Sequence, residues 1–263
     1  MSLGTTQFMQ VFLSSMLVVV IMLSHTSKDD HLINGDAFYQ SCNNDRALKE
    51  YQLAYNDSPS DYNVLLRIVR IHNDIGRIQL RTGFESEKHY RLAAVFADSL
   101  ERYYPDSAAA HFWFALAQGS LIPFVGMHEK IAIGKEVKLQ LQETLQRDST
   151  FSYAYVLKAI FEREGSQLSW LEKGIVRIVF GEDLSGSLQA SEQYLRKALQ
   201  YDTTNSFAYY ELFWTYKAME DTAGALSALQ QVLKMPPRSL REQNQQEEAR
   251  QQLQKLINNN QSD

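Results

Sequence analysis

The sequence contains little cysteine, proline or glycine. In 263 residues there are one cysteine, five prolines and twelve glycines. A single cysteine excludes an internal disulfide framework and any metal site built from several cysteines. Many-stranded sandwiches and barrels need tight turns about every 8–12 residues, which so few prolines and glycines cannot supply. The composition therefore predicts a helical protein.

The charges are nearly balanced and slightly acidic. The 26 Lys and Arg residues face 31 Asp and Glu residues, which gives a formal net charge of −5. No excess of basic residues favours a nucleic acid partner. A hydrophobic content of 44% with 22% charged residues is ordinary for a folded globular chain. We therefore expect one or two packed domains and no nucleic acid binding.

An uncharged segment stands at the N-terminus. Met1 to Leu23 carries no charged side chain, and Val11–Leu23 is apolar except for two serines. As a helix this apolar run is about 20 Å long, shorter than the ~30 Å hydrocarbon core of a bilayer. The length favours a signal peptide, but no Lys or Arg precedes the run. Residues 1–27 are thus predicted to be a signal peptide or an N-terminal membrane anchor, with a buried helix as a third reading. The rest of the chain would be exported, periplasmic in a bacterium, or anchored outside the bilayer.

A spacing of small and aromatic residues recurs along the chain. The first copy resembles the second helix of a tetratricopeptide (TPR) repeat in the spacing of Ala47, Tyr51, Ala54 and Pro59. Four further copies agree: Ala93, Ala97, Leu100 and Pro105; Val137, Leu141, Thr144 and Asp148; Leu195, Ala198 and Asp202; and Ala225, Leu229, Val232 and Pro237. The resemblance implies an all-α, TPR-like superhelix of about five helix pairs over residues 28–237.

The repeats also predict where the helices lie. We expect first helices at residues 62–76, 108–118, 152–165 and 206–219, with Gly76 and Gly165 ending theirs. In the first pair, Gly35 and Phe38 take the small and aromatic contact positions. The spacing of the units exceeds a 34-residue period, which places insertions of about 12, 10 and 20 residues inside the second, third and fourth pairs. Residues 238–263 are predicted to form a capping helix and polar tail, with one face on the last repeat and the other in water.

Four stretches resemble the regulator of microtubule dynamics family. They are Leu65–Ile75 (LLRIVRIHNDI), Ala110–Ala115 (AHFWFA), Lys130–Asp148 and Gln167–Lys173 (QLSWLEK). The resemblance extends over roughly residues 62–237 and includes the positions of the insertions. It implies a helical, non-catalytic interaction domain behind an N-terminal membrane segment, with lipid binding or transfer in one branch of the family.

Patterns that would carry catalysis do not occur in the sequence. No two of the six histidines have the four-residue spacing of a zinc-protease helix, and no serine lies in a G-x-S-x-G turn. His111 lies in an apolar run, where a packing role is expected. Cys42 falls at a turn position, where a small half-buried residue is expected. We predict no catalytic residue, no cofactor and no metal.

TPR geometry predicts the residues that line the inner surface of the superhelix. They are Leu66, Arg70, Phe112, Leu116, Tyr153, Val156, Ile160, Arg163, Phe207, Tyr210, Trp214 and Lys217. So many apolar side chains should be covered. The cover would be the apolar insertions, among them Leu168, Leu171, Ile175, Ile178 and Val179; an apolar ligand; or a hydrophobic partner helix. Arg70, Arg163 and Lys217 would bind the charged end of an amphiphile, or pair with Glu164 or Glu211.

Three functions remain open from the sequence. The first is a non-catalytic TPR scaffold, exported or membrane-anchored, that binds other proteins. The second is a module that binds or transfers a lipid, a fatty acid or another hydrophobic ligand in its apolar groove. The third is an assembly factor that forms homo-oligomers through an exposed stripe. An uncleaved N-terminal segment would add the membrane as a partner.

Overall fold

The computed structural model describes residues 27–78, 84–169, 173 and 186–260. The described residues contain helices and no strand. The helices are α2 (Lys28–Gln40), α3 (Asn44–Asp57), α4 (Tyr62–Ile78), α5 (Phe84–Tyr103), α6 (Ala108–Gly119), α7 (Met127–Arg147), α8 (Ser152–Gln167), α10 (Leu188–Tyr201), α11 (Ser206–Ala218), α12 (Thr222–Lys234) and α13 (Leu240–Asn260), with a short 3₁₀ helix, η2 (Ile122–Phe124).

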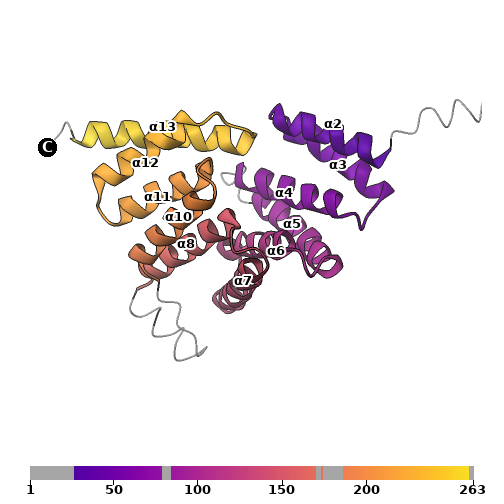
Figure 1. Cartoon of the computed structure of the whole chain (residues 1–263), viewed down its shortest axis with the longest axis horizontal. Coiled ribbons are helices and arrows are strands. Elements are labelled where there is room, and N and C mark those ends of the chain that lie inside the picture. The colour runs from indigo at the N-terminus through magenta and orange to yellow at the C-terminus, as the bar shows by residue number, and fades with distance from the viewer. Residues whose placement is uncertain (1–26, 79–83, 170–172, 174–185, 261–263) are drawn as a thin grey trace, which may run out of the picture.

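Successive helices pack in antiparallel pairs. The pairs are α2 with α3, α4 with α5, α6 with α7, α8 with α10, and α11 with α12. Each pair also packs on the next, so the chain curves into an arch (Figure 1). The predicted all-α, TPR-like superhelix of five helix pairs is confirmed.

Local chemistry fixes most of the helix ends. Five helices begin with an N-cap side chain that accepts a hydrogen bond from a backbone N–H in the first turn. These N-cap residues are Ser27, Asn43, Ser107, Asn205 and Asp221. Three of the prolines follow closely after the ends of α3, α5 and α12, as the repeat pattern predicted. The four predicted first helices begin at the expected residues and end within two residues of the expected positions.

Small residues allow close approach of the two helices of a pair. The ring of Tyr51 occupies the space beside Gly35 that a Cβ atom would take, as predicted for the contact position. Gly76 has the same role toward Tyr90. The prediction that Gly76 and Gly165 end their helices is wrong, because α4 continues to Ile78 and α8 to Gln167. Gly76 is needed for helix packing and not for a cap.

The inserted residues lengthen helices more than they form loops. In the second pair, α4 has 17 residues and α5 has 20, and in the third pair α7 has 21. The third pair also contains η2, whose Phe124 ring lies 6.0 Å from the ring of Tyr90. In the fourth pair, most of the insertion lies outside the described residues, including Leu171, Ile175, Ile178 and Val179, so its predicted packing over the inner surface stays a prediction.

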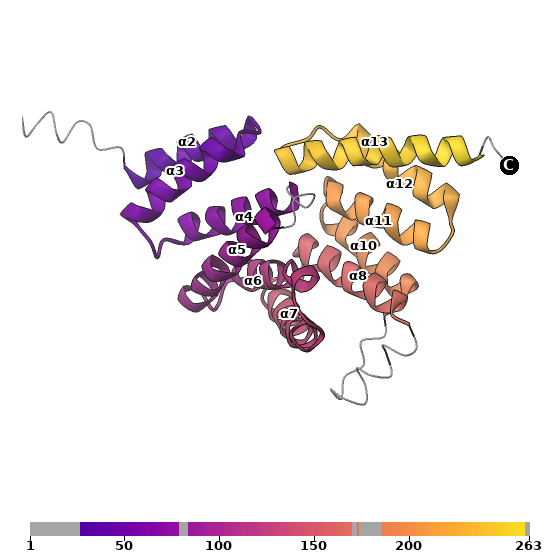
Figure 2. The same cartoon turned by 180° about the vertical axis from the view of Figure 1, so that it is seen from behind.

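The C-terminal helix closes the arch. α13 packs on α12 and α11, as a capping helix should, and it also packs on α4 in the second pair. In Figures 1 and 2, α13 crosses the open side of the arch toward the end of α2. The contact with α4 extends the packed side of α13 beyond the last repeat, while Gln243, Glu247 and Arg250 on its other side are exposed, as a capping helix requires.

No helix within the described ranges is long and apolar enough to span a membrane. The apolar run Val11–Leu23 lies outside those ranges.

Candidate functional site

The inner surface of the superhelix is formed by the first helix of each pair. Among these helices and α13, α4 contacts α6, α8 contacts α11, α11 contacts α13, and α13 contacts α4. The twelve predicted inner residues lie on four of these helices, α4, α6, α8 and α11. The sequence did not predict that α13 would be part of this surface.

An aromatic run crosses three inner helices. The ring of Phe112 in α6 lies 6.2 Å from that of Tyr153 in α8, and Tyr153 lies 6.0 Å from Phe207 in α11. Further along α11, the ring of Tyr210 lies 6.2 Å from that of Trp214, edge to face. The structure thus brings together the aromatic residues that the repeat register had predicted to share one surface.

The predicted inner residues differ in exposure. Phe112, Val156, Arg163 and Tyr210 are buried. The half-buried residues are Leu66, Arg70, Leu116, Tyr153, Ile160, Phe207 and Trp214, and only Lys217 is exposed. Leu66 packs against the cluster of Leu65, Leu100 and Ala110, so it contributes to the contact between pairs. The chain therefore covers much of this apolar surface with its own residues.

Arg163 forms a structural ion pair within the inner surface. Its Nη1 donates to the Glu211 carboxylate at 2.6 Å, and its Nη2 lies 3.2 Å from Glu164. Burial alone would lower the pKa of Arg163, but the two carboxylates raise it above its usual value. The pairing links α8 to α11 and leaves Arg163 committed to Glu164 and Glu211, the partners that the sequence suggested.

The N-terminal end of the inner surface is rich in arginine. The guanidinium of Arg70 lies over the Tyr39 ring, 4.1 Å from its centroid, and donates to the Tyr51 hydroxyl at 3.2 Å. Arg67 makes a bidentate contact with Asp36 at 2.7–3.0 Å. Burial would raise the pKa of Asp36, but Arg67, the Tyr51 hydroxyl and Arg70 together lower it below its usual value, so this carboxylate stays ionised.

α13 joins the two ends of the arch through a contact that we call the latch, formed by Tyr39, Asp74 and Arg241. The Asp74 side chain is 4% exposed; it accepts a hydrogen bond from the Tyr39 hydroxyl at 2.6 Å and lies 3.2 Å from Nη1 of Arg241. Burial, and then the charge of Asp74, raise the pKa of Tyr39, which remains a hydrogen-bond donor. The latch connects α2, α4 and α13.

Two residues of α11 extend the contact with α13. Arg241 also lies over the Phe207 ring, 4.4 Å from its centroid. Tyr210 donates to the Glu248 carboxylate at 2.7 Å, and Arg77 of α4 lies 3.8 Å from the same group. Sequence reasoning missed Tyr39, Asp74, Arg241 and Glu248 because residues up to 167 positions apart meet only when the whole arch curves.

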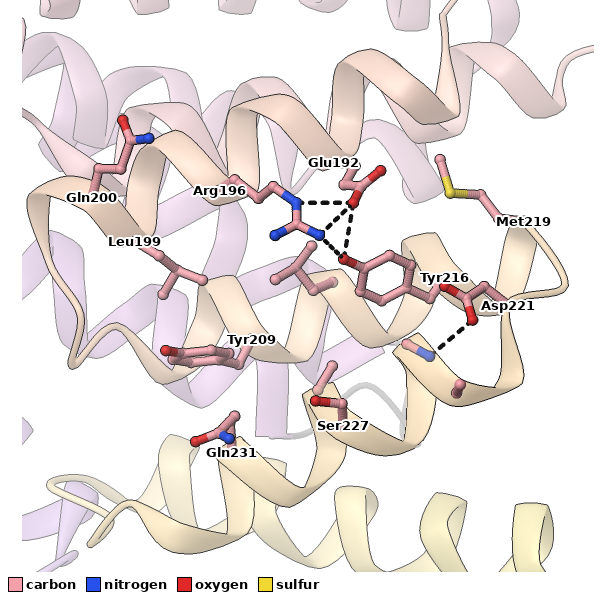
Figure 3. Close-up of a pocket in the computed structure, with 14 residues that line it drawn as sticks. Glu192, Arg196, Leu199, Gln200, Tyr209, Tyr216, Met219, Asp221, Ser227 and Gln231 are labelled. Carbon is pink, nitrogen blue, oxygen red and sulfur yellow. Dashed lines mark hydrogen bonds and ion pairs between the residues drawn. The ribbon is translucent and has the colours of Figure 1, made fainter.

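An open pocket lies away from the inner surface. It has a volume of about 810 Å³ and lies between α10, α11 and α12 (Figure 3). At one end Arg196, Glu192 and the Tyr216 hydroxyl hydrogen-bond to one another at 2.9 Å. Leu199, Tyr209 and Leu212 line it, but none of the predicted inner residues does. Arg196, Glu192 and Tyr216 are thus engaged with one another, and the Asp221 carboxylate accepts a hydrogen bond from the Gly224 N–H at 2.9 Å.

Other candidate reactive groups serve packing. His111 contacts the Gln140 side chain at 2.5 Å and the Pro105 carbonyl at 2.7 Å, so its predicted packing role is confirmed. Cys42 has a φ of 62° in the turn between α2 and α3 and is half-buried, as expected for its position. Over the described ranges, no group of three or more His, Cys, Asp and Glu residues could hold a metal ion.

A solved structure supports the fold. A thermophilic TPR protein of Thermus thermophilus matches 85% of this chain and 98% of its own, with a TM-score of 0.60 and 16% sequence identity. At that identity the match bears on the fold alone.

Curated relatives share one description. Human regulator of microtubule dynamics protein 2 is 25% identical over 73% of this chain, and mouse regulator of microtubule dynamics protein 1 is 22% identical over 66%. The chain spans only 46% of the human protein and 56% of the mouse protein. The family model described as regulator of microtubule dynamics protein 1-3 matches residues 27–257, nearly all of the part folded into helices. The chain therefore belongs to the regulator of microtubule dynamics family.

Proposed function

We propose that the chain is a non-catalytic scaffold that binds protein partners through the inner surface of its superhelix. Helical-repeat proteins present such curved surfaces to other proteins. The observation that carries the proposal is the chemistry of the half-buried inner residues, four of which are aromatic or arginine and three of which are aliphatic. Tyr153, Phe207, Trp214 and Arg70 are of the types that supply most of the binding energy at protein interfaces.

Lys217, near the C-terminal end of α11, gives a direct test of partner binding by the inner surface. Lys217 is exposed, and its Nζ lies 4.9 Å from the centroid of the Trp214 ring. A photo-crosslinking residue at position 217, introduced into the full chain in its native cells, is expected to capture a defined protein. The matched control places the same group at Lys255, an exposed residue of α13. Identical products from both positions, or products unchanged by Trp214→Ala, would contradict the proposal.

The family description supplies the first partner to test. Polymerised tubulin is that partner, and co-sedimentation of the full chain with microtubules is the measurement. We expect Lys217→Glu to weaken co-sedimentation if the inner surface makes the contact, whereas Lys255→Glu should leave it unchanged. Equal loss in both variants would indicate attraction by overall charge instead.

A hydrophobic-ligand function is the second candidate. It is favoured by the aromatic run from Phe112 through Tyr153 to Phe207, which could lie against an acyl chain of a lipid or fatty acid. Native mass spectrometry of the full chain purified from cells would show an added mass of lipid size, reduced by Tyr153→Ala. Detection of the bare polypeptide alone would exclude a tightly held lipid and favour the protein-binding function.

We further propose that residues 1–27 direct the scaffold to a membrane or across it. The support is the uncharged, apolar run Val11–Leu23. Fractionation of native cells combined with the intact mass of the protein separates the two forms. A cleaved chain in a soluble exported fraction indicates a signal peptide, and a full-length chain in the membrane fraction indicates an anchor. A full-length chain in the soluble cytoplasmic fraction would overturn both.

A further inference from the structure

The two halves of α13 differ in chemistry. The C-terminal half contributes Ala249, Leu253 and Leu256 to the hydrophobic cluster built on the last two pairs. Residues 241–248 of the N-terminal half have the sequence REQNQQEE, which contains no apolar side chain, and this half meets α4. We call residues 240–248 the strap. α13 is thus fixed to its own repeat by apolar packing, whereas the strap contacts the second pair through polar groups.

Two ion pairs join the strap to α4. Arg241 and Glu248 lie two helical turns apart on one face of α13. Arg241 lies 3.2 Å from Asp74, and Glu248 lies 3.8 Å from Arg77 in a pair whose side chains are 42% and 47% exposed. Among the described residues, no hydrophobic cluster combines side chains of α13 and α4, whereas the clusters of the first three pairs share Phe96. Closure of the arch therefore depends on charges, which salt and competing ions weaken.

The latch also leaves hydrogen-bond donors unpaired. Nε of Arg241 and Nε of Arg70 are buried, and neither has a hydrogen-bond partner. Opening the contact to water would satisfy such donors, which favours the open arch. The pairing of Arg241 with the nearly buried Asp74 carboxylate favours the closed arch. These opposing effects make the free-energy difference between the closed and open arch small.

The strap covers part of the inner surface. Arg241 lies over the ring of Phe207, the last member of the aromatic run, and Glu248 accepts a hydrogen bond from Tyr210. A protein that contacts Phe207 must therefore displace Arg241. Asp74 would then lose the base with which it pairs, unless the incoming protein supplies another cation.

We propose that the strap is an autoinhibitory segment, in which Arg241 takes the place of a basic side chain of the protein partner. This inference rests on the proposed binding function of the inner surface and adds its regulation. In the closed arch, Arg241 occupies the site between Asp74 and Phe207. A partner segment that carries arginine or lysine takes this site and holds the arch open, so partner binding and closure exclude each other.

Closure can be measured without the partner. Spin labels attached to Ile33→Cys in α2 and Gln243→Cys in α13, both exposed positions, report the distance across the latch when Cys42→Ser removes the native thiol. Double electron–electron resonance should show one short distance in this chain and an added longer one in Arg241→Ala. Arg250→Ala, the matched control, should leave the distribution unchanged. Circular dichroism confirms that each variant is folded, and an unchanged distribution in Arg241→Ala would overturn the proposal.

Partner capture separates the strap from the function on which it rests. With the photo-crosslinking group at position 217, Arg241→Ala should raise the yield of the captured protein about fivefold or more, whereas Arg250→Ala should not change it. Capture of a defined protein at equal yield from the native chain and Arg241→Ala would overturn autoinhibition and leave the scaffold function intact. Capture of no defined protein by any of the chains would contradict the scaffold function itself.

Asp74→Asn tests the basic side chain of the partner. This substitution removes the charge that holds Arg241, so the longer spin-label distance should appear as in Arg241→Ala. The open arch then lacks the carboxylate that would pair with the partner's base, so we expect less than half of the capture seen in Arg241→Ala. Equal capture by the two variants would show that the partner brings no base to Asp74, and would overturn that part of the proposal.

Discussion

At the scale of single residues, close packing decides the role of the glycines. Gly76 lies inside α4, and a Cβ there would lie 2.8 Å from the Tyr90 ring, which is buried. Gly119 at the end of α6 has only one neighbour, Val137 Cγ2, at an ordinary 3.7 Å. The two glycines look alike in the sequence, and only the position of the facing helix separates them.

We expect Gly76→Ala to destabilise the protein by about 1–3 kcal/mol, because the Tyr90 ring must move within a packed core. The matched control, Gly119→Ala, should range from no change to a gain of about 1 kcal/mol, since alanine costs less backbone entropy in a helix. Urea unfolding of the full chain measures both values. An equal response of the two variants would show that the Tyr90 contact does not limit the site.

A buried histidine pair makes stability depend on pH. Nδ1 of His72 in α4 lies 2.9 Å from Nδ1 of His89 in α5, so at least one of the two rings must be an acceptor. Burial, and then the charge of His89, lower the pKa of His72 to about 4. Burial also lowers the pKa of His89, with Lys88 in the same direction and Glu85 and Asp45 opposing it. Both rings are therefore expected to be neutral near pH 7.

The sign of this dependence follows from proton uptake. An unfolded histidine takes up a proton near pH 6.5, whereas folded His72 does so only near pH 4. Lowering the pH through that window therefore favours the unfolded state, by about 2–3 kcal/mol in total. His72→Gln should flatten the fall in unfolding free energy between pH 7 and pH 4. A slope identical to that of the native chain would mean that other groups cause the acid sensitivity.

At the scale of elements, the latch is the contact that joins α13 to α2 and α4. A double-mutant cycle with Asp74→Asn and Arg241→Ala is expected to give a coupling energy of about 1–3 kcal/mol, because Asp74 is nearly buried. Hydrogen exchange should also accelerate in the first turns of α13. The control is Arg250→Ala, whose pair with Glu247 is exposed on both sides and should change stability by less than about 0.5 kcal/mol. Additive single effects would show that Asp74 and Arg241 are not coupled.

At the scale of the whole molecule, closure of the arch should affect cooperativity. An open repeat array has contacts between neighbouring pairs only, so its ends can unfold separately. The latch adds a contact between the second pair and the C-terminus, and we expect it to couple the two ends. The loss of the far-ultraviolet circular dichroism signal and the loss of hydrogen-exchange protection in α2 and α3 should therefore occur at the same urea concentration.

Arg241→Glu would place a second negative charge beside Asp74 and open the arch. In this variant we expect α2 and α3 to lose protection at lower urea than the remaining helices, which is a departure from two-state unfolding. Arg250→Glu is the charge-matched control and should unfold as the native chain does. If α2 and α3 unfold with the rest of the chain in Arg241→Glu, closure by the latch does not contribute to cooperativity.

The sequence by itself determined the helices, their order and their register. Helix starts depend on local chemistry such as the caps at Ser107 and Asn205, and the pairing depends on small residues such as Gly35 opposite Tyr51, so both can be recognised over short distances. The aromatic members of the inner surface could be predicted for the same reason. Only the tertiary structure decided that Arg241 meets Asp74 and that Phe84 and Val95 stay exposed on α5. These outcomes depend on the curvature that accumulates over five pairs, and small rotations between successive pairs leave no signal in the sequence.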